Sequence, residues 1–278
     1  MKVTFWGTRG SIPTFGPDTQ KYGGNTPCVT VSHKDTLLIL DAGSGIRNLG
    51  ESSLPVKFRK VHILLTHLHM DHIQGLGFFG PFFNPNAEIH LWGPSGSTMS
   101  LHKRLSQYLS PPLFPIRMRD FNCEFHVHEL PLKNLNIGPF KILIDYVCHP
   151  GPTVGFRITQ SKCILTYIPD HEPALGVAEF PNEPEWTSGY SLSEGAHLLI
   201  HDAQFSSEEY ELRNGWGHSS IKDTLKLAEL AGVRSLSLFH HDPSHTDAQL
   251  EMWFTQLNLS QYPYDVAYAI ESETIELL

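Results

Sequence analysis

Short apolar runs separated by Gly, Pro and Asn make up most of the first two thirds of the chain. Runs rich in Val, Ile, Leu and Thr predict β-strands, because these side chains pack well on a buried pleated surface. The predicted strands span residues 2–6, 28–33, 36–41, 61–65, 124–130, 141–147, 154–159 and 162–167. A helix is predicted over residues 97–109, and it ends before the Pro-rich stretch 111–115. Strands with interleaved helices indicate an α/β protein.

The last third of the chain has the clearest pattern. A strand is predicted over residues 198–200, followed by a helix that begins at Ser219 or Ser220, since serine caps helix N-termini. A further strand covers residues 236–239. The Pro- and Gly-punctuated segment 172–195 is either an ordinary surface loop or a loop that lies over the site.

Histidine or aspartate follows within about two residues of five predicted strand ends. These ends lie at residues 65, 148, 168, 200 and 239. A metal site at one edge of a sheet needs ligands on loops that leave several strands at the same edge. The recurrence therefore predicts one site built from distant parts of the chain.

Residues 66 to 72 read Thr-His-Leu-His-Met-Asp-His, which places four potential metal ligands in seven positions. His67 and His69 are two residues apart in extended backbone, so their side chains point to the same side. Asp71 and His72 lie where the chain turns towards a helix and can serve a second metal. Imidazole and carboxylate are the usual ligands of zinc, iron and manganese. The segment therefore predicts a dinuclear site.

Histidine is abundant in this chain, which has 17 of them. Isolated pairs such as His126 and His128 are therefore interpreted as surface residues. A histidine-rich surface turn is also the alternative for residues 66–72, but the density of ligands there favours the metal site.

Length and composition favour one domain, over residues 1–278, because 278 residues with 40% hydrophobic content can bury a sizeable core. No apolar segment of membrane-spanning length and no signal-peptide pattern is found, so we expect a soluble, cytoplasmic protein. The cysteines are Cys28, Cys123, Cys148 and Cys163, without CxxC spacing. They are interpreted as thiols in a reducing compartment.

The formal charge of −9 argues mildly against a large polyanionic partner, because nucleic-acid binding usually requires a basic face. Two bound divalent cations would still make the pocket locally positive. A small anionic substrate therefore fits the charge better than a nucleic acid does.

With these residues assembled, the chain resembles the metallo-β-lactamase superfamily of metal-dependent hydrolases. The resemblance is carried by His67-x-His69-x-Asp71-His72, Cys148-His149, Tyr167-Ile168-Pro169-Asp170 and Phe239-His240, and it covers essentially the whole chain. It implies a four-layer αββα sandwich, with mostly mixed β-sheets and outer helices. It also implies two divalent metal ions, with zinc favoured over manganese or iron.

The same resemblance implies how the ligands divide between the two metals. One metal would be held by His67, His69 and His149, the other by Asp71, His72 and His240, and Asp170 would bridge them. His241 is the alternative to His240, because spacing does not separate neighbouring histidines.

Within the superfamily, the chain is similar to the branch of ribonuclease Z and the cyclic-nucleotide phosphodiesterases. His201 through Phe205 resemble the branch's HEATF-like motif, and Gly217-His218-Ser219-Ser220 resembles its HST-like motif. Asp202 replaces a glutamate, which makes its contact with His218 less secure. The long Gly/Pro- and Lys-rich insertion with which ribonuclease Z grasps tRNA is not found. The absence of this insertion favours small phosphodiesters such as 3',5'-cyclic nucleotides over tRNA as substrates. Relatives in the branch are often dimers, so a homodimer stays open.

Phosphodiester hydrolysis at such a site would use a metal-activated hydroxide as the nucleophile. We expect Asp71 to contribute to catalysis as well as to metal binding, and His218 to protonate the leaving group, since histidine titrates in the useful range. Asp202 would orient His218 and raise its pKa if the two are in contact. The alternative for His218 is a surface residue that precedes a helix.

Other residues are less clear. Asp41 is interpreted as a loop cap or as a support for a ligand histidine, and Arg9 as a structural residue of a turn. Arg157 and His171 stay ambiguous. Three other functions also stay open: hydrolysis of esters, lactones or thioesters, a ribonuclease Z-like nuclease, and a non-hydrolytic role in cofactor biosynthesis.

Overall fold

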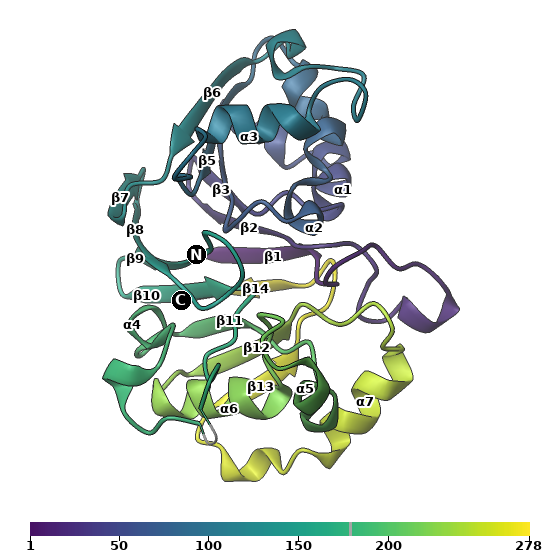
Figure 1. Ribbon diagram of the computed structural model, residues 1–278. Coiled ribbons are helices and arrows are strands. Elements are labelled where there is room, and N and C mark those ends of the chain that lie inside the picture. The colour runs from purple at the N-terminus through teal and green to yellow at the C-terminus, as the bar shows by residue number, and fades with distance from the viewer. Residues whose placement is uncertain (178–179) are drawn as a thin grey trace.

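The computed structural model describes residues 1–177 and 180–278, and within them the strands form two seven-stranded sheets (Figure 1). The first sheet has the order β14-β1-β2-β3-β4-β5-β6 and the second β13-β12-β11-β10-β9-β8-β7. The strands of the first sheet are β1 (Lys2–Gly7), β2 (Cys28–His33), β3 (Thr36–Leu40), β4 (Lys60–Leu64), β5 (Glu88–Gly93), β6 (Glu124–Glu129) and β14 (Thr274–Glu276). Those of the second are β7 (Lys133–Ile137), β8 (Phe140–Tyr146), β9 (Val154–Gln160), β10 (Cys163–Ile168), β11 (Leu198–Asp202), β12 (Ser235–Phe239) and β13 (Asp265–Tyr268).

Helices cover the outer face of each sheet (Figure 1). On the first sheet lie α1 (Gly45–Glu51), α2 (Met70–Ile73) and α3 (Leu101–Tyr108), and on the second α4 (Tyr190–Ser193), α5 (Ser207–Arg213), α6 (Ile221–Leu230) and α7 (Asp247–Gln256). This is the predicted αββα sandwich with mixed sheets, so the fold class is confirmed. The predicted strands are present to within a residue or two, whereas β5, β7, β13 and β14 were not predicted.

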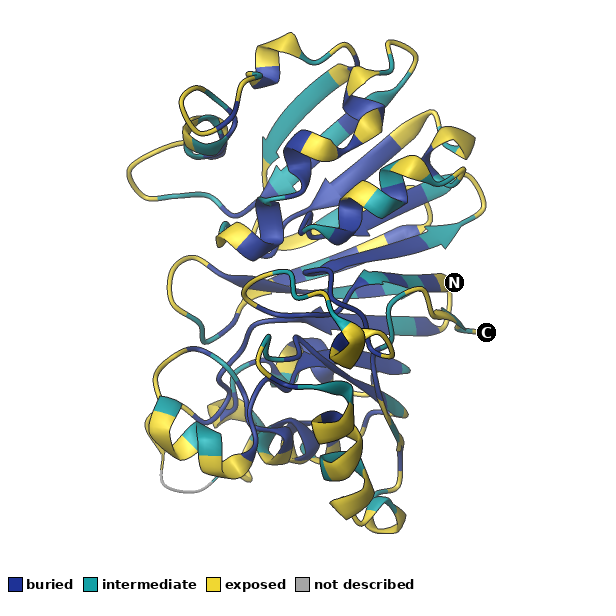
Figure 2. Cartoon of the chain, turned by 90° about the vertical axis from the view of Figure 1, so that its right-hand side faces the viewer, coloured by how far each residue is buried: buried dark blue, intermediate teal, exposed yellow. Residues whose placement is uncertain are grey.

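The core lies in three layers, as the alternation of buried and exposed side chains requires. Val31, Phe156 and Ile200 belong to the layer between the two sheets. Ile63 and other residues of β4 and β5 pack against α1 and α3, and Leu225 of α6 packs on the second sheet. Figure 2 shows the buried strands in the middle of the molecule and the exposed faces of the helices outside.

Helix boundaries follow side-chain capping. The hydroxyl of Ser220 accepts a hydrogen bond from the backbone N–H of Asp223 at 3.0 Å and begins α6. Ser100 caps α3, which is shorter than the predicted helix 97–109. Thr246 caps the last helix, α7.

Two parallel blocks of strands position the site. In the first sheet β3, β4, β5 and β6 are parallel neighbours, and in the second β10, β11, β12 and β13 are. The carboxyl ends of parallel strands lie at the same edge of a sheet. Asp41, Thr66, Asp170, Asp202 and His240 follow or end five of these strands, so their side chains meet at that edge.

The remaining fold-level expectations concern thiols and membrane helices. All four cysteines are free thiols, as expected. Among the residues that the structure describes, no helix is both long and apolar enough to cross a membrane.

Candidate metal centre

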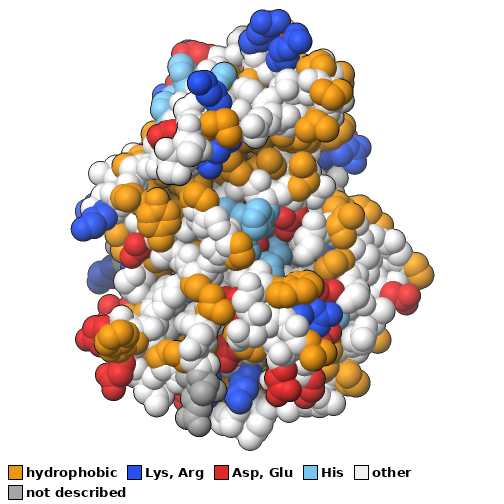
Figure 3. All heavy atoms as spheres, in the orientation of Figure 1, with side chains coloured by type: hydrophobic (Ala, Val, Ile, Leu, Met, Phe, Trp, Pro, Cys, Tyr) orange, Lys and Arg blue, Asp and Glu red, His pale blue; other side chains and the backbone are white. Residues whose placement is uncertain are grey.

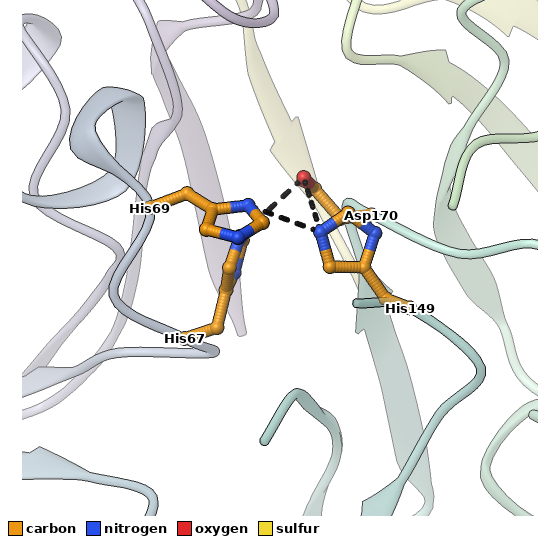
Figure 4. Close-up of side chains that lie close together, drawn as sticks. All are labelled: His67, His69, His149 and Asp170. Atoms are coloured by element: carbon orange, nitrogen blue, oxygen red, sulfur yellow. Dashed lines mark hydrogen bonds and ion pairs between the residues drawn. The ribbon is translucent and has the colours of Figure 1, made fainter. Parts of the chain in front are cut away.

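Four of the predicted ligands form a first cluster. His67 and His69 lie on the extended segment after β4, while His149 and Asp170 come from the second sheet (Figure 4). One ligand atom from each of the four lies within 4.8 Å of the others. His149 Nε2 is 3.1 Å from His69 Nδ1, and the Nε2 atoms of His67 and His149 are 3.6 and 3.7 Å from Asp170 Oδ2.

A second cluster lies on the other side of Asp170. His72 Nε2 and His240 Nε2 lie 3.0 and 3.2 Å from Asp170 Oδ1, and 3.4 and 3.2 Å from Asp71 Oδ2. Asp170 therefore presents one carboxylate oxygen to each cluster. The seven predicted ligands are brought together in the predicted division, with Asp170 shared. Figure 3 shows histidine and acidic side chains at the bottom of a hollow with an apolar rim.

Three polar atoms that point into these clusters fit a bound metal. His67 Nε2, His72 Nε2 and Asp170 Oδ1 are buried and make no hydrogen bond within the described part of the chain. Such orphaned atoms are costly unless another group satisfies them. Metal ions held by His and Asp would satisfy all three at once.

The charge states of the cluster residues also fit bound metal ions. Burial lowers the pKa values of His67, His69 and His149, so these imidazoles are neutral and keep a lone pair. Burial would also lower the pKa of His72, but the carboxylates of Asp170, Asp71 and Asp41 raise it well above its ordinary value. Buried carboxylates so crowded require a compensating positive charge, and divalent cations supply one.

Hydrogen bonds with residues around the two clusters fix the orientation of the cluster side chains. Asp41, which closes β3, accepts a hydrogen bond from His72 Nδ1 at 2.9 Å, from the Tyr167 hydroxyl at 3.0 Å and from the backbone N–H of Thr66 at 2.7 Å. Because Nδ1–H is used in this way, Nε2 of His72 keeps its lone pair for a metal. Asp41 thus supports a histidine of the second cluster.

The same arrangement recurs at two further histidines of the clusters. His149 Nδ1 donates to the Gly217 carbonyl at 2.7 Å, and His240 Nδ1 donates to Gln204 Oε1 at 3.0 Å. In each ring the remaining Nε2 points at the cluster. The backbone N–H of Ser11 donates to Asp71 Oδ2 at 2.8 Å and holds that carboxylate in place.

His240 and His241, which spacing left unresolved, differ clearly in position. His240 adopts a left-handed backbone conformation with φ of 62° and turns its ring into the second cluster. His241 Nε2 donates instead to the Ala269 carbonyl at 2.9 Å, and its ring packs against Tyr22 and Tyr268. Burial lowers the pKa of His241 to about 3. The structure places His240, not His241, in the second cluster.

His218 lies at the edge of the centre and contacts Asp202. Its Nδ1 donates to Asp202 Oδ2 at 2.7 Å, and its ring stacks on that of His240 with centroids 5.0 Å apart. Burial lowers the pKa of His218, but the Asp202 carboxylate outweighs burial and raises it to about 9. From the sequence, the contact between His218 and Asp202 was less secure, because aspartate is shorter than glutamate. In the structure, the buried end of β11 places Asp202 within hydrogen-bond distance of His218.

Arg9 and Arg157 make hydrogen bonds that hold other segments of the chain in place. The buried Arg9 side chain donates to the carbonyls of Gly23, Asp242 and His245, so it braces three loops and does not face the centre. Arg157 donates to the carbonyls of Leu192 and Glu194.

His171 lies behind the centre. Its backbone N–H donates to Asp202 Oδ2 at 3.0 Å, and its ring nitrogens lie 2.8 Å from His201 Nε2 and 2.9 Å from the Ser188 hydroxyl. Ser188 also accepts a hydrogen bond from the backbone N–H of Cys148. Within the described part of segment 172–195, Ser188 thus supports residues behind the centre. Residues 178–179 lie outside the described residues.

Sequence reasoning missed several supporting groups. Gln204 and Gly217 each accept a hydrogen bond from a histidine of the clusters, and both lie in the motifs that carry the resemblance, so their positions were a usable signal. Ser11 donates to Asp71 and Tyr167 donates to Asp41, in each case to a residue far away in the sequence. Only the folded structure shows these two contacts.

Comparison with known proteins identifies the family. The model of the beta-lactamase superfamily domain matches residues 36–241. The ribonuclease Z of Thermococcus gammatolerans is 26% identical over 282 residues, covering 86% of this chain and 83% of that protein. The chain belongs to the beta-lactamase superfamily, and it is a metal-dependent hydrolase of the phosphodiesterase type.

Solved structures share the fold along the full length of the chain. The metallo-beta-lactamase fold protein YhfI of Bacillus subtilis has a TM-score of 0.71 and 20% identity, covering 99% of this chain and 98% of YhfI. The short form of human tRNase Z has a TM-score of 0.67 and 20% identity, with both chains fully covered. These likenesses concern the fold.

Proposed function

We propose that the chain hydrolyses small phosphodiesters, with 3',5'-cyclic nucleotides as the substrate class. The observation that carries this proposal is the His218–Asp202 pair beside the second ligand cluster. Cleavage of an unactivated phosphodiester releases an alkoxide, which needs a proton. A protonated imidazole next to the centre provides it.

The metal roles follow from the clusters. His67, His69 and His149 would hold one divalent ion, and Asp71, His72 and His240 the second, with Asp170 shared. Two such ions, zinc in our proposal, would activate water as the nucleophile and would neutralise charge on the phosphodiester. Asp71 keeps its place through the Ser11 N–H, and the ligand rings keep theirs through Asp41, Gln204 and Gly217.

A cleft beside His218 supports a small nucleotide as the substrate. Its volume is about 470 Å³, and Trp216, Arg213 and Phe205 are part of its lining. The Arg213 guanidinium lies 5.1 Å from the Phe205 ring and 6.0 Å from the Trp216 ring, and Trp216 is 63% exposed. An exposed indole offers a stacking surface for a base, and a guanidinium beside it attracts phosphate.

A ribonuclease Z-like activity is the second candidate, because the curated relatives with this name cover most of the chain. The formal charge of −9 argues against it. One assay separates the two. Metal-reconstituted protein is offered 3',5'-cyclic AMP and a precursor tRNA with a 3' trailer, each with and without chelator.

We expect chelator-sensitive hydrolysis of the cyclic nucleotide and little cleavage of the RNA. Faster cleavage of the precursor tRNA would assign the nuclease function instead. If neither substrate nor bis(p-nitrophenyl) phosphate is turned over, the phosphodiesterase proposal is wrong. Ester or lactone hydrolysis that survives His218→Ala but is lost in Asp170→Ala would then assign the carboxylic ester class.

A further inference from the structure

A second group of potential ligands lies on the first sheet, outside the metal centre. Three parallel strands, β4, β5 and β6, place side chains in register on one face. The cross-strand rows are Lys60, Glu88 and Glu124, then His62, His90 and His126, then Leu64, Trp92 and His128. Side chains two residues apart on a strand share a face, so carboxylates and imidazoles form a compact grid.

The imidazoles of this grid contact one another directly. The rings of His62 and His90 stack with centroids 5.0 Å apart, and those of His90 and His126 at 4.6 Å. His90 Nε2 lies 2.9 Å from Glu88 Oε1, and His90 Nδ1 lies 2.8 Å from His128 Nε2. His126 Nε2 lies 3.1 Å from Glu124 Oε1. Both carboxylates of the grid are thus already turned towards imidazole nitrogens.

We propose that Glu88, His90 and His126 bind a divalent transition-metal ion of the zinc or copper type. One ligand atom from each of the three lies within 4.8 Å of the other two. Two imidazoles and one carboxylate are a ligand set that zinc, copper and nickel accept. His128 and Glu124, in hydrogen-bond distance of His90 and His126, orient the two rings.

The site is accessible to an ion. The His90 side chain is 14% exposed and that of His126 is 39% exposed, so a metal reaches them from solvent without a change in the fold. Figure 3 shows histidine and acidic side chains at the surface where β6 lies. The site is therefore separate from the hollow of the metal centre.

The surrounding charges permit a cation. The grid holds two carboxylates, those of Glu88 and Glu124, and one ammonium group, that of Lys60. Lys60 competes for Glu88, with Nζ 2.6 Å from Oε1, but its side chain is half exposed and can move into solvent.

A metal at this position would join two strands. β6 is the edge strand of the first sheet, and beyond it no strand of the described residues pairs in that sheet. Glu88 and His90 belong to β5 and His126 to β6, so an ion held by them crosslinks the edge strand to its neighbour. Such an ion stabilises the folded state by mass action.

The test counts ions on the full chain. Protein whose centre has first been filled with zinc is dialysed against micromolar zinc, and bound metal is measured by mass spectrometry. We expect one further equivalent, weakened by about 10- to 100-fold or more in His90→Ala and in His126→Ala. His102→Ala, an exposed histidine on α3, is the matched control and keeps it.

A spectroscopic readout identifies the ligands. Copper(II) added to the zinc-filled protein should give an electron paramagnetic resonance signal with hyperfine structure from two nitrogens, and one nitrogen in His126→Ala. Glu88→Gln provides a variant that keeps the shape of the side chain and should also weaken binding. Absence of a further equivalent in the wild-type chain overturns the proposal, and so does binding that persists in all three variants.

Discussion

His218 Nδ1 lies 2.7 Å from Asp202 Oδ2, while the same ring stacks on His240 of the second ligand cluster. The contact orients the ring and supplies the negative charge that favours its protonated form. A ring so placed is able to deliver a proton at the edge of the centre.

Replacement of His218 by alanine tests this role through the leaving group. We expect kcat/KM for 3',5'-cyclic AMP to fall by about 100- to 10,000-fold, because its alkoxide needs a proton. Hydrolysis of bis(p-nitrophenyl) phosphate should fall far less, since p-nitrophenolate leaves unprotonated. Equal losses on both substrates would contradict a general acid and indicate a structural role.

Asp202→Asn tests the electrostatic part of the contact. Burial lowers the pKa of His218, and Asp202 reverses this and raises it to about 9. A general acid must be protonated, so activity is lost as pH rises through this pKa. Without the carboxylate the pKa falls, and the alkaline limb of the kcat/KM profile should move to lower pH. An unchanged alkaline limb would exclude this electrostatic role.

Gly10 leaves room for His240, which makes it a sensitive position. A Cβ at Gly10 would overlap the His240 imidazole, whereas a Cβ at Gly16 meets none of the described atoms within 4 Å. We expect Gly10→Ala to displace His240 and to weaken the second metal by about 10- to 100-fold, measured by competition with a fluorescent chelator. Gly16→Ala is the matched control and should bind as the wild type does. Equal metal affinity in both variants would contradict the assignment of His240.

Trp216 is the expected stacking surface for a base. Loss of base stacking costs about 1–3 kcal/mol, so we expect Trp216→Ala to raise KM for 3',5'-cyclic AMP by about 5- to 150-fold. Trp186, which is 81% exposed on a short 3-10 helix and does not line the cleft, provides the control in Trp186→Ala. If both variants keep the wild-type KM, the cleft is not the nucleotide site.

The sequence predicted which side chains the structure brings together in the two clusters, because these residues follow strand ends, and strand ends are marked by apolar runs. His67 and His69 could be predicted from the alternation of side chains along extended backbone. Asp71 could be predicted from its position at the start of a helix. The assignment of each residue to one of the two clusters came from the family resemblance. Sequence spacing does not show on which side of Asp170 the distant His149 lies.

Other features depend on register between strands, which the sequence does not give. His62, His90 and His126 are far apart in the chain, and each by itself is an ordinary polar position of a strand. Only the pairing of β4, β5 and β6 makes them neighbours. β5 and β7 were missed because they carry Glu, His, Asn and Lys among their apolar residues, which weakens the apolar signal.

The most direct test of the account is a metal titration of the stripped protein with activity followed in parallel. Using a chain with His90→Ala and His126→Ala, so that only the main centre counts, bound zinc and hydrolysis of 3',5'-cyclic AMP are measured together. We predict that hydrolysis appears as the second ion per chain binds and that chelation abolishes it. Full occupancy by two ions without hydrolysis, or hydrolysis by the metal-free chain, would contradict the account.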